Sequence, residues 1–274
     1  MPPTLFCRGN NAGIRHARGD LIALLNNDTE VSLEWLRSLF EASLRWPEAG
    51  FFASKMLRFD RRDVIDSAGD EFHTAGFAAK RGCGQRDGPD YAREQPVFGA
   101  CAGAALYRRS MLDRIGLFDE DFYANVEDVD LSFRAQLCGY PCVYVPEAKV
   151  YHKVGATIRR NWDWFYWSRR NHLWVVVKNM PSLLLARYLP SVLVYNASSL
   201  LYHIWNGRGR LVLRAYAAAL RGLPGMLAKR RSIQSARTAD IQYIESILTK
   251  GGLRARASSP YLRGRCHTPT SPRA

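Results

Sequence analysis

This chain contains two clusters of acidic and amide side chains. Side chains of these types can bind metal-bound phosphates or accept protons. The first is Asn26-Asn27-Asp28, which directly follows the apolar run Leu21–Leu25. A continuous apolar run of this length predicts a strand covered on both faces. Ligands of open α/β sheets bind beyond the carboxyl ends of strands, and a carboxylate beside neutral oxygens suits a hard divalent ion. Asn and Asp also form ordinary turns, so the stretch alone leaves both interpretations open.

The second cluster places six acidic residues among aromatic ones within residues 119–130. Acidic residues at a helix start are explained by capping and by the helix dipole, and Asp130 and Arg134 have the spacing of an ordinary ion pair. One helix start needs one cap, however, and not six acids. A carboxylate flanked by aromatic side chains is a good candidate for a raised pKa, which a general base requires.

The sequence pattern around these clusters predicts an α/β domain. Residues 60–96, rich in Gly and charge, predict loops and short strands. Alternating apolar runs and helical patterns predict further strands over residues 50–59, 104–107 and 141–145 and helices over 33–45, 109–115 and 130–138. Ser32 is the predicted N-cap of the first of these helices, and Trp46-Pro47 ends it.

Charge and cysteine content narrow the class of protein. Residues 1–150 carry 18 Lys+Arg against 22 Asp+Glu, whereas residues 151–274 carry 21 against 3. A mildly acidic half joined to a strongly basic half predicts that the second half meets a polyanionic surface. The six cysteines show neither a CxxC pair nor zinc-type spacing, so we interpret them as small buried side chains in a reducing compartment.

The basic half contains an apolar segment, Leu183–Trp205, about as long as a membrane span. Arg187, Pro190, Asn196 and His203 interrupt it, which favours a pair of helices lying in a membrane interface over a span. The basic side chains expected to face anionic lipid are Arg208, Arg210, Arg214, Arg221, Lys229, Arg230 and Arg231. The alternative is a soluble helical core with a solvated basic face. Binding of nucleic acid through phosphates and stacking is a further alternative, but no recognisable nucleic-acid motif occurs and no nucleic acid is expected as partner.

Several motifs in order resemble the family 2 glycosyltransferases of the GT-A fold, and most of all their bacterial rhamnosyltransferase type. The resemblance covers roughly residues 8–180. The family's N-x-G…A-x-G segment is matched by Asn11, Gly13, Ala17 and Gly19. The family's DxD motif is matched by Asn26, Asn27 and Asp28. Its later loop, its acidic block and its downstream histidine are matched by Gly103, Arg108, Arg109, Gly116, Phe118, Asp119, Glu120, Phe122, Glu127, Asp128, Asp130, Arg134 and His152.

The resemblance implies an inverting transfer of a sugar, with rhamnose as one candidate, from a nucleotide-diphosphate sugar to a hydroxyl of a glycan or lipid-linked glycan in cell-surface polysaccharide synthesis. Asp28 and His152 would hold a divalent metal, Mg²⁺ or Mn²⁺. Asp128 would be the general base. Donor-binding residues would be Asn11, Gly13, Ala17, Gly19, Asn26 and Asn27, and acceptor-binding residues Gly103, Arg108, Arg109, Glu127 and Asp130.

The same resemblance implies an unusual organisation. The family's opening β-α-β unit, which binds base and ribose, has no counterpart before Leu21, so we expect an incomplete catalytic domain with an exposed apolar sheet edge and without activity of its own. The expected fold is a mostly parallel GT-A sheet with flanking helices over residues 1–180. A helical, membrane-associating region over 181–251 and a disordered basic tail over 252–274 would follow. The expected location is the cytoplasmic face of the plasma membrane. The alternative function is an inactive remnant that binds membrane or nucleic acid.

Overall fold

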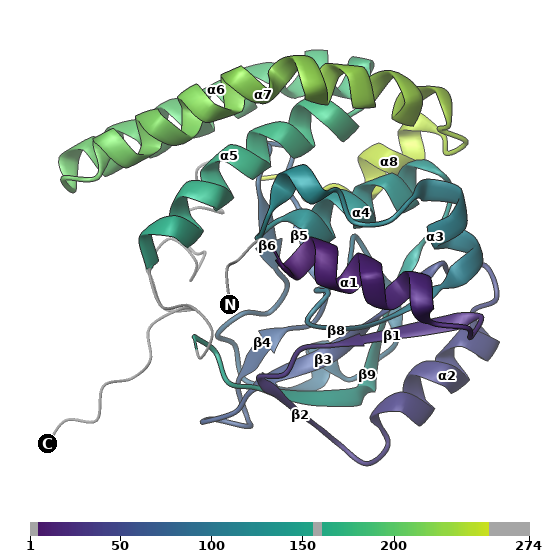
Figure 1. Cartoon of the computed structure of the whole chain (residues 1–274). Coiled ribbons are helices and arrows are strands. Elements are labelled where there is room, and N and C mark those ends of the chain that lie inside the picture. Colours follow the sequence, from purple (N-terminus) through teal and green to yellow (C-terminus); the bar gives the residue numbers. More distant parts are fainter. Residues whose placement is uncertain (1–4, 156–160, 252–274) are drawn as a thin grey trace, which may run out of the picture.

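The computed structural model describes residues 5–155 and 161–251. In that part of the chain a β-sheet is covered by helices on both faces, and long helices of the second half lie above it (Figure 1). The strands are β1 Leu21–Leu25, β2 Thr29–Val31, β3 Phe51–Arg58, β4 Ile65–Ser67, β5 Asp70–Phe72, β6 Ala78–Lys80, β7 Gln95–Val97, β8 Ala104–Arg108 and β9 Cys142–His152. The α-helices are α1 Leu5–His16, α2 Trp35–Arg45, α3 Arg109–Ile115, α4 Glu127–Leu137, α5 Asn161–Asn179, α6 Ser182–Trp205, α7 Gly209–Ser235 and α8 Ile241–Ile247, with short 3₁₀ helices η1 Pro89–Tyr91 and η2 Glu120–Phe122.

The main sheet is mixed, with strand order β1-β8-β3-β9-β2, while β4 pairs with β3 and β7 with β9. Among the described strands β3 and β9 form a parallel pair, and the neighbouring pairs are antiparallel. The expectation of a mostly parallel sheet is therefore corrected to a mixed one. Because β8 runs against both β1 and β3, the strands β1, β3 and β9 nevertheless point the same way. Their carboxyl ends meet at one edge of the sheet.

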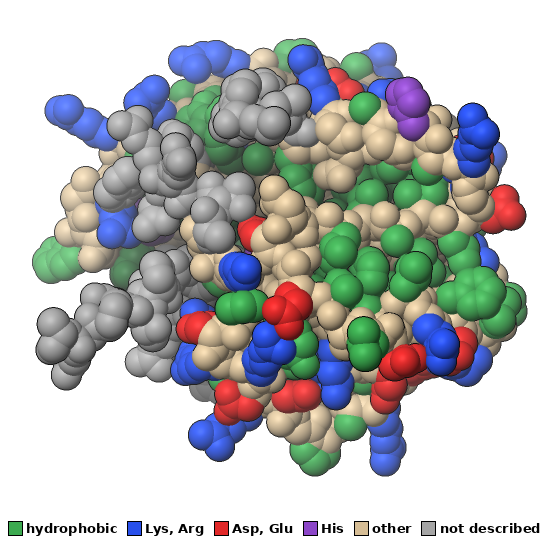
Figure 2. Space-filling view, turned by 60° about the horizontal axis from the view of Figure 1, so that its bottom comes forward, with side chains coloured by type: hydrophobic (Ala, Val, Ile, Leu, Met, Phe, Trp, Pro, Cys, Tyr) green, Lys and Arg blue, Asp and Glu red, His purple; other side chains and the backbone are tan. Residues whose placement is uncertain are grey.

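Strand β1 lies at the end of the strand order and pairs with β8, its partner among the described strands. Its side chain Leu25 is 45% exposed, and Leu36, Phe40 and Leu44 of α2 are also exposed. Figure 2 shows hydrophobic side chains gathered on this side of the molecule. The expected exposed apolar sheet edge is therefore present in the described part of the chain.

Several elements differ from expectation at their ends. Helix α2 starts at Trp35 and has no side-chain cap; Ser32 contributes only its backbone carbonyl, which accepts from the Trp35 N–H at 3.1 Å. Strand β9 continues beyond Pro146 to His152, because the pairing with β3 skips residues 146–148 between Ser54 and Lys55. A proline is tolerated where the strand ladder is interrupted in this way.

Two apolar layers cover the sheet. On one face Ile22 and Leu24 pack with Phe51 and with residues of α1 and α3. On the other face Phe52 and Met56 share a cluster with Trp35, Leu39 and Ala42 of α2. The alternation along β1 and β3 sends neighbouring side chains to opposite faces, so both faces need helices. These layers fix the direction of the strand ends that carry the polar residues.

The helices of the second half pack onto α4 and share a hydrophobic core with it. Helix α5 is pressed against α7, where a Cβ on Gly222 would come within 2.3 Å of the Trp174 ring. Helices α6 and α7 form a long antiparallel hairpin across the top of the molecule (Figure 1). Residues 183–205 thus lie within the single helix α6, which contains Pro190, rather than in two short helices. No helix among the described residues is long and apolar enough to cross a membrane.

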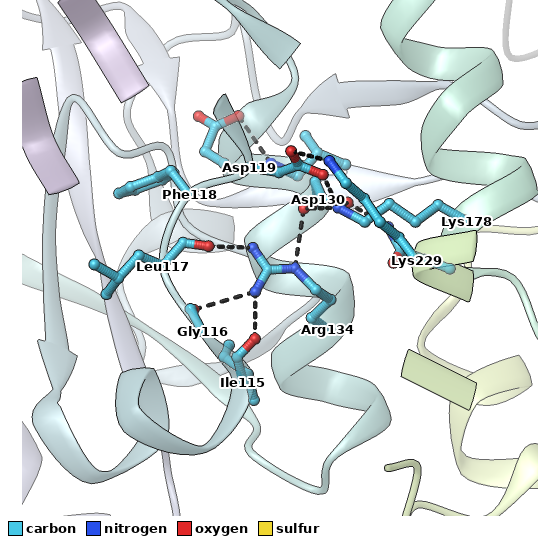
Figure 3. A network of polar contacts seen from close by, with 12 residues as sticks. Ile115, Gly116, Leu117, Phe118, Asp119, Asp130, Arg134, Lys178 and Lys229 are labelled. Atoms are coloured by element: carbon cyan, nitrogen blue, oxygen red, sulfur yellow. Dashed lines mark hydrogen bonds and ion pairs between the residues drawn. The ribbon is translucent and has the colours of Figure 1, made fainter. Parts of the chain in front are cut away.

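A network of buried charges joins the two halves (Figure 3). The carboxylate of Asp130, with no exposed surface, accepts from Arg134 at 3.0 Å, from Lys178 at 2.9 Å and from Asn179 at 2.8 Å. Lys178 also donates to Asp119 at 2.6 Å, and Lys229 of α7 binds the same carboxylate. Although burial opposes ionisation, the two lysines lower the pKa of Asp119 to about 2. The network therefore joins α4, α5 and α7 through ion pairs between ionised carboxylates and basic side chains.

Candidate active site

Asp28 and His152 meet at the shared strand edge. Thr29 is paired with His152 in the β2–β9 ladder, and the N–H of Lys153 donates to the carbonyl of Asp28 at 2.9 Å. The Nε2 atom of His152 lies 3.6 Å from Oδ1 of Asp28. The sequence placed these residues 124 positions apart, and the folding of β9 onto β2 brings them together.

A second aspartate fixes the orientation of the histidine. Asp66, at β4, is 2% exposed, and its Oδ2 contacts His152 Nδ1 at 2.9 Å and Lys80 Nζ at 2.8 Å. Burial opposes ionisation, but Lys80 and His152 hold the pKa of Asp66 well below its usual range. Burial also works against the charged His152, yet its contacts with Asp28 and Asp66 raise its pKa. A histidine ligand typically presents its second ring nitrogen to such a carboxylate.

These residues fit a divalent metal as a two-ligand set. The described residues contain no group of three or more His, Cys, Asp or Glu side chains arranged to hold a metal. A Mg²⁺-type site commonly takes one or two protein ligands and completes its shell with substrate phosphates and water. Asp28 and His152, with Asp66 behind the histidine, match that arrangement.

Asp128 lies in the first turn of α4 and is linked to Asn26-Asn27-Asp28, the candidate metal motif, through the short backbone segment Ala102-Gly103. Its Oδ2 accepts the N–H of Ala102 at 3.2 Å, and its Oδ1 accepts its neighbour's N–H, from Val129, at 2.9 Å. Gly103, which follows Ala102 in the chain, accepts the N–H of Asn26 with its carbonyl at 2.9 Å. A Cβ on Gly103 would come within 3.3 Å of the Asn26 amide nitrogen, so the two halves of the site approach closely there.

Three carboxyl groups around α4 have raised pKa values. Burial raises the pKa of Asp128, and hydrogen bonds from Ala102 and Val129 partly offset it. Burial and the charge of Asp128 raise the pKa of Glu127 and of Asp70 well above the usual range. One oxygen each of Glu127 and Asp70 is buried without a hydrogen-bond partner in the described structure. Unpaired buried carboxyls with shifted pKa values are typical of functional sites.

The sequence did not single out Asp66, Asp70 and Lys80. They lie in the region expected to form only loops and short strands. The available signal was the spacing of two aspartates around Ser67-Ala68-Gly69 between short β-like segments. Short strands of three residues give too little alternation to establish which side chains point to a common edge.

Asp130 has a different place from the one expected. It was predicted to bind the acceptor, but it is fully buried and its carboxylate is held by the ionic network of Figure 3. Glu127, its predicted companion, remains beside Asp128 in the first turn of α4. The correction follows from helical geometry: residues 128 and 130 are about 200° apart around the helix axis.

Arg108 and Arg109 also require a correction as acceptor-binding residues. Antiparallel pairing places Arg108 opposite Leu21 and Ala104 opposite Leu25, so the arginines lie at the far end of β1, roughly 13 Å of strand away from its carboxyl end. Arg108 donates to carbonyls of Ala49, Ser43 and Trp46. Both arginines therefore support loops of the fold.

The residues that match the N-x-G…A-x-G segment lie in two different places. Arg109 donates to the carbonyls of Gly19 at 2.9 Å and Ala17 at 2.7 Å, so these two predicted donor-binding residues lie at the same far end. Asn11 of α1 is buried and exchanges two hydrogen bonds with the backbone of Phe118. Gly13 is exposed on α1, with open space where a Cβ would be. In the described structure Asn26 and Asn27 remain the donor-side candidates at the metal motif.

The fold and the site together define an α/β domain of the GT-A type. Structural comparison supports this class: a crystal structure of GalNAc-T7 with UDP, GalNAc and Mn²⁺ matches with a TM-score of 0.52 at 15% identity, covering 71% of this chain and 37% of that one. The likeness confirms the predicted fold.

At the level of sequence, residues 6–116 match the model of Glycosyl transferase family 2. N-acetylglucosaminyl-diphospho-decaprenol L-rhamnosyltransferase of Mycobacterium tuberculosis is 30% identical over 156 residues, 51% of this chain and 49% of that protein. O-antigen biosynthesis protein RfbC of Myxococcus xanthus is 29% identical over 160 residues, 55% of this chain and 12% of that protein. The predicted resemblance to family 2 glycosyltransferases of rhamnosyltransferase type is thus confirmed. The chain spans about half the length of the mycobacterial relative.

Proposed function

We propose that this protein transfers a sugar from a nucleotide-diphosphate sugar to a hydroxyl group of a glycan or lipid-linked glycan, in the synthesis of cell-surface polysaccharide. The observation that supports it best is the meeting of two candidate sites: Ala102 binds the carboxylate of Asp128, and Gly103 binds the backbone of Asn26 in the metal motif. Similarity to a rhamnosyltransferase and to an O-antigen biosynthesis protein supports the substrate class. Rhamnose is accordingly the first sugar to test.

The proposed reaction is a single displacement that inverts the anomeric centre. Asp128 accepts the proton of the acceptor hydroxyl as its oxygen forms a bond to the anomeric carbon. The bond from that carbon to the diphosphate oxygen breaks, and its electron pair leaves with the nucleoside diphosphate. The raised pKa of Asp128 makes it a stronger base than an exposed aspartate. The products are the glycoside, the nucleoside diphosphate and one proton.

A divalent ion, Mg²⁺ or Mn²⁺, would be held by Asp28 and His152 together with the donor diphosphate. When bound, it would neutralise charge that develops on the leaving group. Asp66 orients His152 for this role through the 2.9 Å contact at Nδ1. Asn26 and Asn27 are the proposed donor-side polar groups at the same turn.

The proposed activity can be tested on the natural full-length protein. We would incubate it with Mn²⁺, a lipid-linked N-acetylglucosamine acceptor and a panel of nucleotide sugars that includes dTDP-rhamnose, and measure nucleoside diphosphate release and the glycosidic product. Inverted anomeric configuration and loss of activity in Asp28→Ala and His152→Ala are expected, with the exposed α3 variant Asp113→Asn as control. Product with retained configuration, or unchanged activity in both site variants, would contradict the proposal.

We further propose that the outer face of the α6–α7 hairpin lies on an anionic membrane at the cytoplasmic side, where a lipid-linked acceptor would be presented. Residues 182–235 contain eight Lys+Arg and no acidic residue. Leu183, Val194 and Leu201 of α6 and Leu213 and Leu220 of α7 are exposed, an arrangement that suits interfacial binding. Two predicted lipid contacts are corrected, because Lys229 binds Asp119 and Asp121, and Arg230 donates to carbonyls of Val177 and Met180.

A further inference from the structure

The segment leading into α4 has an uncommon backbone. Tyr123, Asn125 and Val126 have φ angles of 68°, 70° and 72°. Positive φ is disfavoured for residues with a Cβ and most of all for a β-branched one such as Val126. Val126 is also the residue before α4, and its side chain gives that helix no cap. Such a segment keeps this conformation only if its surroundings impose it.

Two adjacent side chains of α5 supply the constraint. Asn171 has no exposed surface, and its Nδ2 approaches the carbonyl oxygens of Phe122 at 2.9 Å, Ala124 at 3.0 Å and Asn125 at 2.6 Å. Arg170 donates to the carbonyls of Asp121 at 2.9 Å and Phe122 at 3.0 Å. Together the two side chains bind the carbonyls of four residues, Asp121, Phe122, Ala124 and Asn125.

The two clamping side chains are themselves held in place. The Nε of Arg170 donates to Oδ1 of Asn171 at 2.9 Å, which turns the amide nitrogen toward the loop. The guanidinium lies over the rings of Trp167 and Trp174, at 4.4 and 4.0 Å from their centroids. Packing between aromatic rings leaves a planar guanidinium little freedom.

The clamped segment ends one residue before Glu127 and two before Asp128. A change of φ at Val126 would turn the first helical turn and move the Asp128 carboxylate relative to Ala102, with which it makes a 3.2 Å hydrogen bond. Small displacements of a base reduce rate strongly, because proton transfer requires close alignment.

We propose that Arg170 and Asn171 are positioning residues that hold segment 123–126, in which Tyr123, Asn125 and Val126 have positive φ, and thereby aim Asp128 at the acceptor hydroxyl. The inference rests on the proposed function for its catalytic consequence. Neither side chain is assigned any contact with substrate.

The decisive experiment combines loss of the clamp with relief of the backbone constraint. In the natural full-length protein, Asn171→Ala is expected to lower kcat at least tenfold while KM for the nucleotide sugar stays within twofold. Glycine adopts positive φ without steric cost, so adding Val126→Gly to Asn171→Ala is expected to recover at least threefold of the lost rate. Failure of the glycine to recover rate in a folded double variant would overturn the inference.

A matched control is Asn179→Ala, which removes an equally buried asparagine of α5 whose amide donates to the Asp130 carboxylate instead of the loop. Val126→Gly should not recover that variant. Recovery of both variants to the same extent would show a general effect of the glycine and would contradict the clamp.

Amide hydrogen exchange tests the clamp without reference to activity. In Asn171→Ala the amides of residues 123–129 should exchange at least tenfold faster, with those of β3 unchanged. Arg170→Lys, which keeps the charge but loses the fork geometry, should show a smaller increase in the same segment. Faster exchange with no transferase activity in the unsubstituted protein would reject the proposed function while supporting the clamp; unchanged exchange in both variants would reject the clamp.

Discussion

Asp128 and Asp130 illustrate how far a motif can assign residues. Both match the same acidic block, yet one meets the metal motif through Ala102 and Gly103 while the other is buried in an ionic network. The residue types were readable from the sequence. The direction of each side chain was not, because it depends on where α4 begins and on α5, which packs against it.

Asp128→Asn should lower turnover by about a hundredfold or more, the usual range for a general base. The amide keeps the size of the carboxylate but cannot accept the proton. Nucleotide binding measured by calorimetry should barely change, because no described contact joins Asp128 to the metal motif's side chains. Near-normal turnover in Asp128→Asn would remove it as the base, and Asp113→Asn serves as the exposed control.

The pH dependence of turnover should reflect the raised pKa of Asp128. The base works when deprotonated, so activity should fall as pH falls through that pKa, and the fall should begin at a higher pH than for an ordinary aspartate with pKa near 3.9. Since Lys80 lowers the pKa of Asp128, Lys80→Met should move the midpoint further upward. A rate–pH profile that stays flat down to about pH 4 would contradict this assignment.

Glu127→Gln should stabilise the protein at neutral pH. The folded-state pKa of Glu127 is raised by burial, so the unfolded chain loses its proton first and the charge lowers stability as pH rises above the ordinary value. The glutamine removes this penalty. The expected melting temperature rises by roughly 2–4 °C at neutral pH, the effect of about 1 kcal/mol in a protein of this size.

The gain should nearly vanish below about pH 4, where the glutamate is protonated in the unfolded chain as well as in the folded protein. Differential scanning calorimetry at the two pH values measures it. The exposed α2 variant Glu41→Gln controls for surface charge. A larger gain in acid than at neutrality would show that Glu127 is ionised and stabilised in the folded protein.

At the scale of elements, the sequence predicted strands that lead to a polar edge, and the structure has them. Helix α3 matches its predicted range, residues 109–115. The pairing of strands was not predictable, because β8 inserts between β1 and β3 against their direction. Because β8 runs antiparallel to β1, Arg108 lies at the start of β1 and not at the polar edge. A strand's direction is set by distant partners and leaves no mark in its own alternation of side chains.

The buried network should make α5 indispensable for the stability of α4. Lys178→Met removes a 2%-exposed lysine that pairs with Asp119 and Asp130. Breaking such a pair from one side leaves a buried charge and costs roughly 3–5 kcal/mol. Urea unfolding measures this cost. Arg37→Met, at an exposed ion pair with Glu34, should cost less than about 1 kcal/mol, and equal losses in the two variants would contradict the network's importance.

At the scale of the molecule, the strong charge asymmetry of the sequence predicted a surface-binding second half, and the structure gives that half a defined hairpin. The sequence could not show that Lys229 and Arg230 turn inward. Within a run of basic residues, those that face inward cannot be told from those that face solvent. Their partners, Asp119 and the end of α5, lie far away in the chain.

The hairpin predicts binding to anionic vesicles. Leu201→Glu combined with Trp205→Glu should reduce sedimentation with phosphatidylglycerol-rich vesicles by at least about tenfold, because it places charge in the apolar contact face. Salt should weaken binding only in part. Leu36→Glu with Phe40→Glu on α2, which are also exposed apolar residues, should have no such effect. Equal pelleting of the hairpin variant and the unsubstituted protein would exclude this face.

The ionic network also orders events during synthesis. Asp130 is separated from Lys178 by 48 residues, and Asp119 from Lys229 by 110. At a translation rate of roughly 5–20 residues per second, the ribosome makes Lys178 about 2 to 10 s after Asp130, and Lys229 about 5 to 20 s after Asp119. Until Lys178 and Lys229 have been made, Asp119 has neither of its lysine partners, and Asp130 has only Arg134 of its own helix as a cationic partner. We therefore expect α4 to dock onto α5 late in translation, and this is the period in which a chaperone would be of use.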